Sequence, residues 1–139
     1  MDIKLVVGLI SFCGVVSSGL IQYYLGRRNE LKKKEIEVRT QAYLDLINSV
    51  SRIASDRKYG KSRTREQLGD INQAKTNVIL VGSDDVVNAV HSFFTQYGDL
   101  SSDDSCRAFS KIIEAMRVDL LGENKMKENI LFESLFGCR

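Results

Sequence analysis

Apolar residues along the chain follow two patterns, an unbroken run near the N-terminus and a helical periodicity in the residues after it. The run from Leu5 to Leu25 is uncharged and mostly apolar. About 20 residues rising ~1.5 Å each match a hydrocarbon layer of roughly 30 Å, and a single segment satisfies its own backbone there only as a helix. The sequence therefore predicts a transmembrane anchor over residues 1–26.

Charged residues on the two sides of this run predict its orientation. Lys4 precedes the run and is offset by Asp2, whereas a group of cations follows within about ten residues. By the positive-inside tendency we expect the N-terminus outside the cell and the rest of the chain in the cytoplasm. We also expect the following cations to contact anionic lipid headgroups. These residues are Arg27, Arg28, Lys32, Lys33 and Lys34.

Two other N-terminal signals compete with a membrane anchor as interpretations of this segment. In a cleaved signal peptide, Val16 and Ser18 would supply the small-residue cleavage site, but the preceding segment is barely positive and the following cations resist translocation. A lipoprotein signal needs a small residue before the modified cysteine, whereas Phe12 precedes Cys13. The uncleaved anchor is therefore the preferred interpretation.

The remaining residues are typical of helices. The chain has no proline, and no stretch alternates between polar and apolar residues for long enough to predict a strand. Apolar positions at helical spacing run from Asn29 to about Lys58, and the spacing is most regular after Val38. Gly26 is the single helix-breaking residue between this stretch and the anchor. We therefore expect a membrane-proximal long helix over residues 27–57, continuous with the anchor, and a turn at residues 59–62.

Capping signals divide residues 58–139 into further helices. Thr64 and Gln67 offer a capping box for a helix that stops at Gly82, and Ser83 caps a helix that closes at Gly98. A fourth helix ends at Gly122, and Asn124 is the expected start of a short fifth. The expected apolar faces are Leu68, Ile71, Val78 and Ile79; Val86, Val87, Val90, Phe94 and Tyr97; Cys106, Phe109, Ile113, Met116 and Leu120; and Ile130, Leu131, Leu135 and Phe136. The prediction is an all-α fold, in which the transmembrane helix is followed by a four- to five-helix antiparallel bundle.

Small and polar residues gather on one face of the predicted transmembrane helix. At 100° per residue they fall within a stripe about 100° wide, opposite Leu9, Leu20 and Tyr24. Lipid tails are as apolar as leucine, so transmembrane helices associate through close backbone approach and hydrogen bonds. The stripe therefore predicts a helix-packing or pore-lining surface, with Gln22 the costliest residue to leave facing lipid. Its residues are Gly8, Ser11, Val15, Ser18, Gly19 and Gln22.

Three interpretations of this face remain open. It can be a tightly packed seam between copies of the chain, or it can line a water-filled pore in a ring of copies. It can also reflect only the ordinary frequency of glycine and serine in membrane helices. The first two make the protein a homo-oligomer.

Charge is distributed unevenly along the chain. Residues 1–65 hold 13 Lys and Arg against 6 Asp and Glu, whereas residues 66–139 hold 7 against 12, so the distal half is acidic and no nucleic acid is expected as a partner. A basic cluster surrounds the predicted turn and is a possible partner-binding surface, for a protein, a neighbouring subunit or a phosphate-bearing ligand; a solvated loop is the alternative. Its residues are Arg57, Lys58, Lys61, Arg63 and Arg65.

Signals for enzymatic chemistry are weak. Gly60-Lys61-Ser62 resembles part of a phosphate-binding loop, but Ser55 stands where the earlier glycine belongs and no strand precedes it. His91 is the single histidine and has no neighbouring nucleophile, and the pairs Asp84–Asp85 and Asp103–Asp104 fit helix starts better than a metal site. We expect no catalytic residue, no metal and no cofactor.

Three segments resemble a widespread group of small bacterial proteins with an N-terminal membrane helix and a cytoplasmic helical domain. They are RTQAYLDLINSVSRI (39–53), AKTNVILVGSDDVVNAVHSFF (74–94) and KIIEAMRVDLLG (111–122). The group's Gly-Ser helix junction is matched by Gly82 and Ser83, and its Met-Arg-x-Asp-Leu pattern by Met116, Arg117, Asp119 and Leu120. The resemblance implies the fold and a bacterial inner membrane. Such proteins also resemble membrane effectors of anti-phage defence, which implies membrane permeabilisation.

The combined prediction is a single-pass protein that self-associates through its membrane helix and binds or senses a protein partner with its cytoplasmic domain, as an effector that forms pores or disrupts the membrane. The alternative is a static anchor or scaffold that recruits a cytoplasmic partner and leaves the membrane intact.

Overall fold

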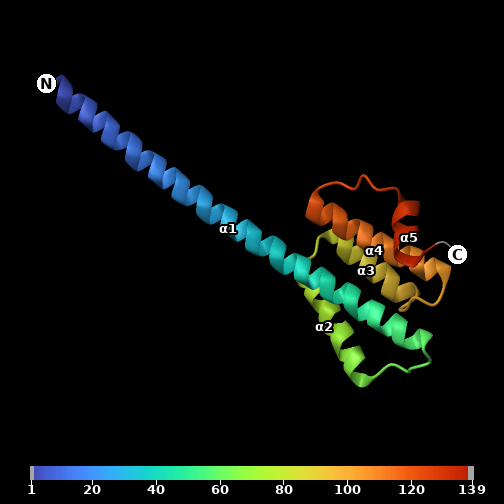
Figure 1. The fold of residues 1–139 in the computed structure, drawn as a ribbon. Coiled ribbons are helices and arrows are strands. Elements are labelled where there is room, and N and C mark those ends of the chain that lie inside the picture. Colours follow the sequence, from blue (N-terminus) through green and yellow to red (C-terminus); the bar gives the residue numbers. More distant parts are fainter. Residues whose placement is uncertain (1, 138–139) are drawn as a thin grey trace. The chain divides into compact units, whose positions relative to one another are not determined.

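The computed structural model describes residues 2–137 and contains five helices in that range. Helix α1 spans Ile3–Lys58, α2 spans Arg65–Val81 and α3 spans Asp84–Gln96. Helix α4 spans Asp103–Leu121 and α5 spans Glu128–Phe136 (Figure 1). The described residues contain no strand, so the all-α prediction is confirmed, as is the long N-terminal helix.

The predicted caps start two of the helices. Thr64 and Gln67 form a reciprocal capping box before α2, with the Gln67 amide nitrogen 3.2 Å from the Thr64 hydroxyl oxygen. The Ser83 side chain accepts from the Val86 amide at the start of α3. Ser102 caps α4 with Ser105, a serine pair that the sequence analysis missed. At the other end of α4, Gly122 has a φ of 82°, the left-handed conformation that glycine adopts without strain.

The expected start of the fifth helix at Asn124 is wrong. Helix α5 begins at Glu128, after Lys127. Asn124 instead stabilises the preceding loop, because its side-chain oxygen accepts from the Met126 amide and its side-chain nitrogen donates to Glu114 on α4. Asn competes for backbone groups in turns as readily as at helix starts, and here the turn is the observed role.

The described residues divide into two units, one up to Glu37 and one from Val38 onward. The second unit, called the helical domain below, has a core contributed by α1 to α4. Helix α3 contacts both α2 and α4, and α5 contacts α4 (Figure 1). The side chains that are most completely removed from water are Tyr43, Leu46, Val78, Val86, Phe93, Ser105, Ser110 and Ile112.

The core stripe of α1 begins later than the sequence indicated. Ala42, Tyr43, Leu46, Val50 and Ile53 are buried, as their spacing predicted. Leu31 and Val38, which share that spacing, are 61% and 57% exposed. Periodicity alone cannot say where along a helix the partner helices begin, and in this chain they begin at residue 42.

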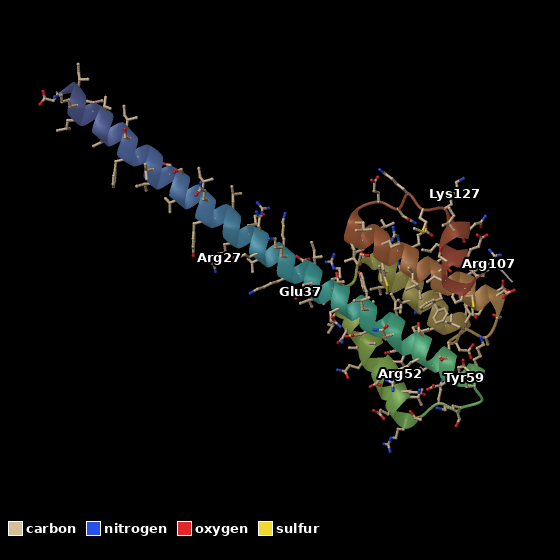
Figure 2. The ribbon with its side chains drawn as sticks, in the orientation of Figure 1. Arg27, Glu37, Arg52, Tyr59, Arg107 and Lys127 are labelled. Atoms are coloured by element: carbon tan, nitrogen blue, oxygen red, sulfur yellow. The ribbon has the colours of Figure 1, made fainter. Side chains whose placement is uncertain are left out.

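The first unit consists of the N-terminal part of α1 alone. Every described side chain from Asp2 to Glu37 is exposed, and Figure 2 shows these side chains projecting from the helix without a second element of that unit beside them. Among the described residues, α1 is the one helix with a segment long and apolar enough to cross a membrane. Signal sequences share this property. The coarse prediction of a membrane-spanning candidate is therefore met.

Candidate functional site

The predicted packing face of the apolar segment has its hydroxyl groups satisfied inside the helix. Ser11 Oγ donates to the Val7 carbonyl and Ser18 Oγ donates to the Val15 carbonyl, each at 2.9 Å. Their oxygens keep lone pairs that can accept, but their protons are already used. The strongest donor left on this face is the Gln22 amide. Nothing within 4 Å would meet a Cβ added at Gly8 or Gly19, so these glycines leave open space at the helix surface.

The cations predicted to reach lipid headgroups follow directly along α1. Arg27, Arg28 and Lys32–Lys34 are all exposed, and they share this stretch with Glu30, Glu35 and Glu37. Arg27 and Glu37 are labelled in Figure 2, near the two ends of this stretch. The mixture of signs leaves a modest positive excess, which fits attraction to an anionic surface of about 1 kcal/mol per well-placed cation.

The basic turn is partly occupied by contacts within the helical domain. The Arg57 guanidinium forms an ion pair with Asp99 in the loop between α3 and α4, and Arg63 donates to the Gly98 carbonyl at 3.2 Å. Lys58, Lys61 and Arg65 are exposed. Two members of the predicted partner-binding set therefore hold the α3–α4 loop against the end of α1, and the three others remain candidates for a partner.

A second polar cluster lies at the opposite end of α2 and was not assigned from the sequence. We call it the Asp119 network: Arg39 and Tyr43 on α1, Asp119 on α4, the Val81 carbonyl and the Ser83 amide. Arg39 Nη1 is 3.2 and 3.4 Å from the two carboxylate oxygens of Asp119, and the Tyr43 hydroxyl donates to Asp119 Oδ2 at 2.5 Å. The network thus ties the end of α4 to α1.

The same two α1 side chains also bind the junction between α2 and α3. Arg39 Nε donates to the Val81 carbonyl at 2.8 Å, and the Tyr43 oxygen accepts from the Ser83 amide at 3.3 Å. A guanidinium at the last carbonyl of α2 also meets the negative end of that helix. Side chains of α1 therefore hold three other elements in one place.

Gly82 is required by the close approach at this junction. A Cβ at Gly82 would lie 2.6 Å from the Val78 carbonyl oxygen and 3.4 Å from the Tyr43 hydroxyl oxygen. The first distance is shorter than real Cβ atoms adopt, and the neighbour is backbone, so it cannot yield by a rotamer change. The Gly-Ser pair noted in the sequence thus combines a steric requirement at Gly82 with a helix cap at Ser83.

The electrostatics of the network favour a protonated tyrosine. Burial, together with the hydrogen bond to Asp119, raises the pKa of Tyr43 to about 12. The Tyr43 residue is only 2% exposed, whereas the side chains of Arg39 and Asp119 are 24% and 11% exposed. The ion pair is therefore shielded from water without being sealed from it.

This shift predicts a loss of stability in alkaline solution. In the unfolded chain Tyr43 releases its proton near pH 10, but in the folded protein it keeps that proton until about pH 12. Between these values the folded state binds more protons, so the free energy of unfolding falls as pH rises. We expect a fall of about 1 to 2 kcal/mol, reduced from the full linkage value because its partners are partly exposed.

The measurement is chemical denaturation at pH 9 to 12 of the wild type and of Tyr43→Phe, which removes the titrating hydroxyl together with its hydrogen bonds to Asp119 and Ser83. Every other ionisable side chain is present in both proteins, and the lost hydrogen bonds lower the stability of the variant at every pH, so the difference in slope between the two curves isolates Tyr43. Parallel curves would contradict the assignment.

Sequence signals for this network existed in part. Gly82, Ser83 and Asp119 stand in the motifs that carry the resemblance, but Arg117 and Asp119 do not share a helix face, so the sequence did not say which one faces the core. In the structure Met116 is buried and Asp119 joins the network. The Nε atom of Arg117 is buried and has no hydrogen-bond partner among the described residues. Arg39 and Tyr43 carried no signal beyond a tyrosine within an apolar stripe.

The residues considered for enzymatic chemistry occupy ordinary helical positions. His91 is exposed on α3, and Asp84 and Asp85 lie in the first turn of that helix. Asp103 and Asp104 occupy the first turn of α4, where carboxylates face the positive end of the helix dipole. Cys13 is exposed, Cys106 is half-buried, and Cys138 lies outside the described residues.

Comparison with known proteins adds no relative from which a role can be transferred. No family model, no curated protein and no solved structure matches the chain. The resemblance to small bacterial membrane proteins therefore stays a prediction.

Proposed function

We propose that this protein is a single-pass bacterial inner-membrane protein whose N-terminus lies outside and whose helical domain lies in the cytoplasm. Copies associate through the face formed by Gly8, Ser11, Val15, Ser18, Gly19 and Gln22. The domain, an antiparallel helical bundle, binds a protein partner, and the protein acts without catalysis or cofactor. The consequence of partner binding is membrane permeabilisation, as in a defence effector.

The observation that carries the proposal is the contrast between the two units. The helical domain has a core of buried apolar side chains, whereas the apolar side chains of residues 3–25 are exposed over the whole circumference of α1. Exposed apolar surface of this extent is unstable in water and stable in a bilayer. The cations after Gly26 support the proposed orientation.

Self-association is supported by the composition of one face. Within lipid, a helix gains little by burying leucine against leucine but gains van der Waals contact where small residues let backbones approach. Gln22 adds an amide whose hydrogen bonds lipid cannot satisfy, so pairing with a second copy lowers the cost of its burial. A seam and a pore lining both follow from this chemistry, and the proposal includes both.

Cysteine cross-linking in vesicles tests the seam. In a Cys13→Ala background, we expect Ser18→Cys, on the proposed face, to form disulfide-linked dimers at least several-fold faster than Leu20→Cys, on the opposite face. Equal rates for the two positions would refute a specific seam. Adding Gln22→Leu to the Ser18→Cys variant should lower the rate, because the interhelical hydrogen bonds are lost.

Dye release from the same vesicles separates permeabilisation from static anchoring. An effector releases dye as protein density rises, and Gln22→Leu reduces the release without affecting insertion. A static anchor that recruits a partner through Lys58, Lys61 and Arg65 releases none at any density. That second outcome would retain membrane anchoring and remove the pore.

A further inference from the structure

The helical domain has an open cavity at the end opposite the Asp119 network. This cavity supports an inference that does not depend on the proposed function. Its volume is about 590 Å³, within the range of small-molecule sites. It lies between the end of α1, the α3–α4 loop and the end of α5. Figure 2 labels Tyr59, which is 78% exposed on its rim.

The floor of the cavity is mostly apolar, although Ser55, Asp99 and Ser101 also line it. Ile53 and Ile71, at 5% and 6% exposure, form part of the floor, and the half-buried side chains of Ala54, Leu100 and Phe136 line it. Protein interiors normally close such space, because unfilled apolar surface forfeits both burial and dispersion contacts. An apolar tail lying in this open cavity would therefore bury part of its surface against these side chains.

The rim carries the opposite chemistry. Consecutive residues Arg57, Lys58 and Tyr59 place two cations and a phenol at its edge. Asp99 pairs with Arg57 and fixes its position, which leaves further guanidinium N–H groups available. Lys58 is exposed and takes part in no ion pair within the described part of the chain. An anionic head at this rim would meet the Lys58 ammonium and the free Arg57 donors.

We propose that this cavity binds a single-chain carboxylate amphiphile, that is, a free fatty acid. The apolar tail lies over Ile53 and Ile71 between Leu100 and Phe136, and the carboxylate lies at Lys58 and Arg57. A single apolar tail with one anionic head matches one apolar cavity beside Lys58, whereas a phospholipid would have to place two acyl chains there. Two of the five cations of the basic turn, Arg57 and Lys58, would thus bind the carboxylate of the ligand.

Photolabelling of the full-length protein in nanodiscs tests this site. The probe is a long-chain fatty acid that carries a diazirine in its tail, and labelled positions are mapped by mass spectrometry. We expect labels on residues 53–59 and 98–106, in addition to labels on residues 5–25 from probe dissolved in the bilayer. The bilayer labels provide an internal standard within each sample.

Two substitutions and one matched control define the outcome. Ala54→Trp fills the cavity and should abolish labelling of residues 98–106. Lys58→Glu should reduce it about tenfold, the loss expected when a hydrogen bond to a charged group is removed. Lys61→Glu reverses an exposed charge in the same turn but outside this cavity, and should leave labelling unchanged. The methyl ester of the probe, which lacks the charge, should label the cavity as weakly as Lys58→Glu does.

The source of the ligand is tested with a photoreactive two-chain phospholipid, which should label residues 5–25 alone. Labelling of the cavity by that lipid would replace a fatty acid with a membrane lipid. Cavity labelling that survives Ala54→Trp with the helical circular dichroism unchanged, or that is absent from the wild type, would overturn the proposal.

Discussion

Asp119→Ala is expected to destabilise the helical domain by about 3 kcal/mol. The substitution leaves the Arg39 guanidinium and the Tyr43 hydroxyl without their shared acceptor in a shielded place, because Arg39 Nη1 and the Tyr43 oxygen both bond that carboxylate. Removing one partner of a buried pair costs more than the pair itself contributes, since the remaining charge stays desolvated. Chemical denaturation of the detergent-solubilised protein, followed by circular dichroism, measures the difference.

Asp70→Ala is the matched control for this loss. Asp70 on α2 pairs with Arg52 at 3.7 Å, but the two side chains are 48% and 67% exposed. Exposed pairs contribute little because water screens them, so we expect a change within about 0.5 kcal/mol. Similar losses for Asp119→Ala and Asp70→Ala would show that the Asp119 network does not hold the elements together.

Asp119→Asn distinguishes charge from shape. The amide keeps an acceptor oxygen for the Tyr43 hydroxyl and the Arg39 guanidinium, so the loss should be smaller than for alanine. The Asp119 carboxylate also raises the pKa of Tyr43, so the amide should lower that pKa toward the value that burial alone produces. The free energy of unfolding of this variant should therefore fall less than that of the wild type as the pH rises from 10 to 12, measured by the same chemical denaturation.

Helix ends were predictable where a cap left a local signature. Thr64 with Gln67, and Ser83 with the acidic pair after it, identified two starts to the residue, since capping depends on groups within one turn. The helix start predicted at Asn124 was wrong because an asparagine side chain satisfies backbone groups in a turn equally well. A capping side chain therefore predicts a helix end only where it does not stabilise a turn equally well.

Core positions were less predictable where two apolar residues are adjacent. The sequence predicts Phe94 and Ile113 on the apolar faces of their helices, and both pack half-buried against the core. Their neighbours Phe93 and Ile112, which the sequence did not assign, are more deeply buried, with 0% and 1% exposure. Neighbours lie 100° apart on a helix, and only the direction of the partner helices decides between them. Long-range packing supplies that direction.

The Asp119 network required the tertiary structure for the same reason. Its three side chains lie 76 and 80 residues apart in the chain, measured from Asp119 to Tyr43 and Arg39. No spacing rule connects residues at such separations, and a tyrosine at a core position is ordinarily counted as apolar. The apolar segment of residues 5–25, in contrast, can be recognised from the composition of one continuous stretch of sequence.

Leu46→Ala is expected to destabilise the helical domain by about 3 kcal/mol, while Leu44→Ala two residues away changes stability by less than about 0.5 kcal/mol. Leu46 is completely buried and Leu44 is 47% exposed, although both lie in α1 and carry the same side chain. Truncating Leu46 loses its transfer free energy and leaves a cavity against the other core helices. Alanine at position 44 loses only partly hydrated surface and gains slightly in helix propensity. Denaturant midpoints of the two variants measure the difference, and equal midpoints would mean that the second half of α1 does not form part of the domain core.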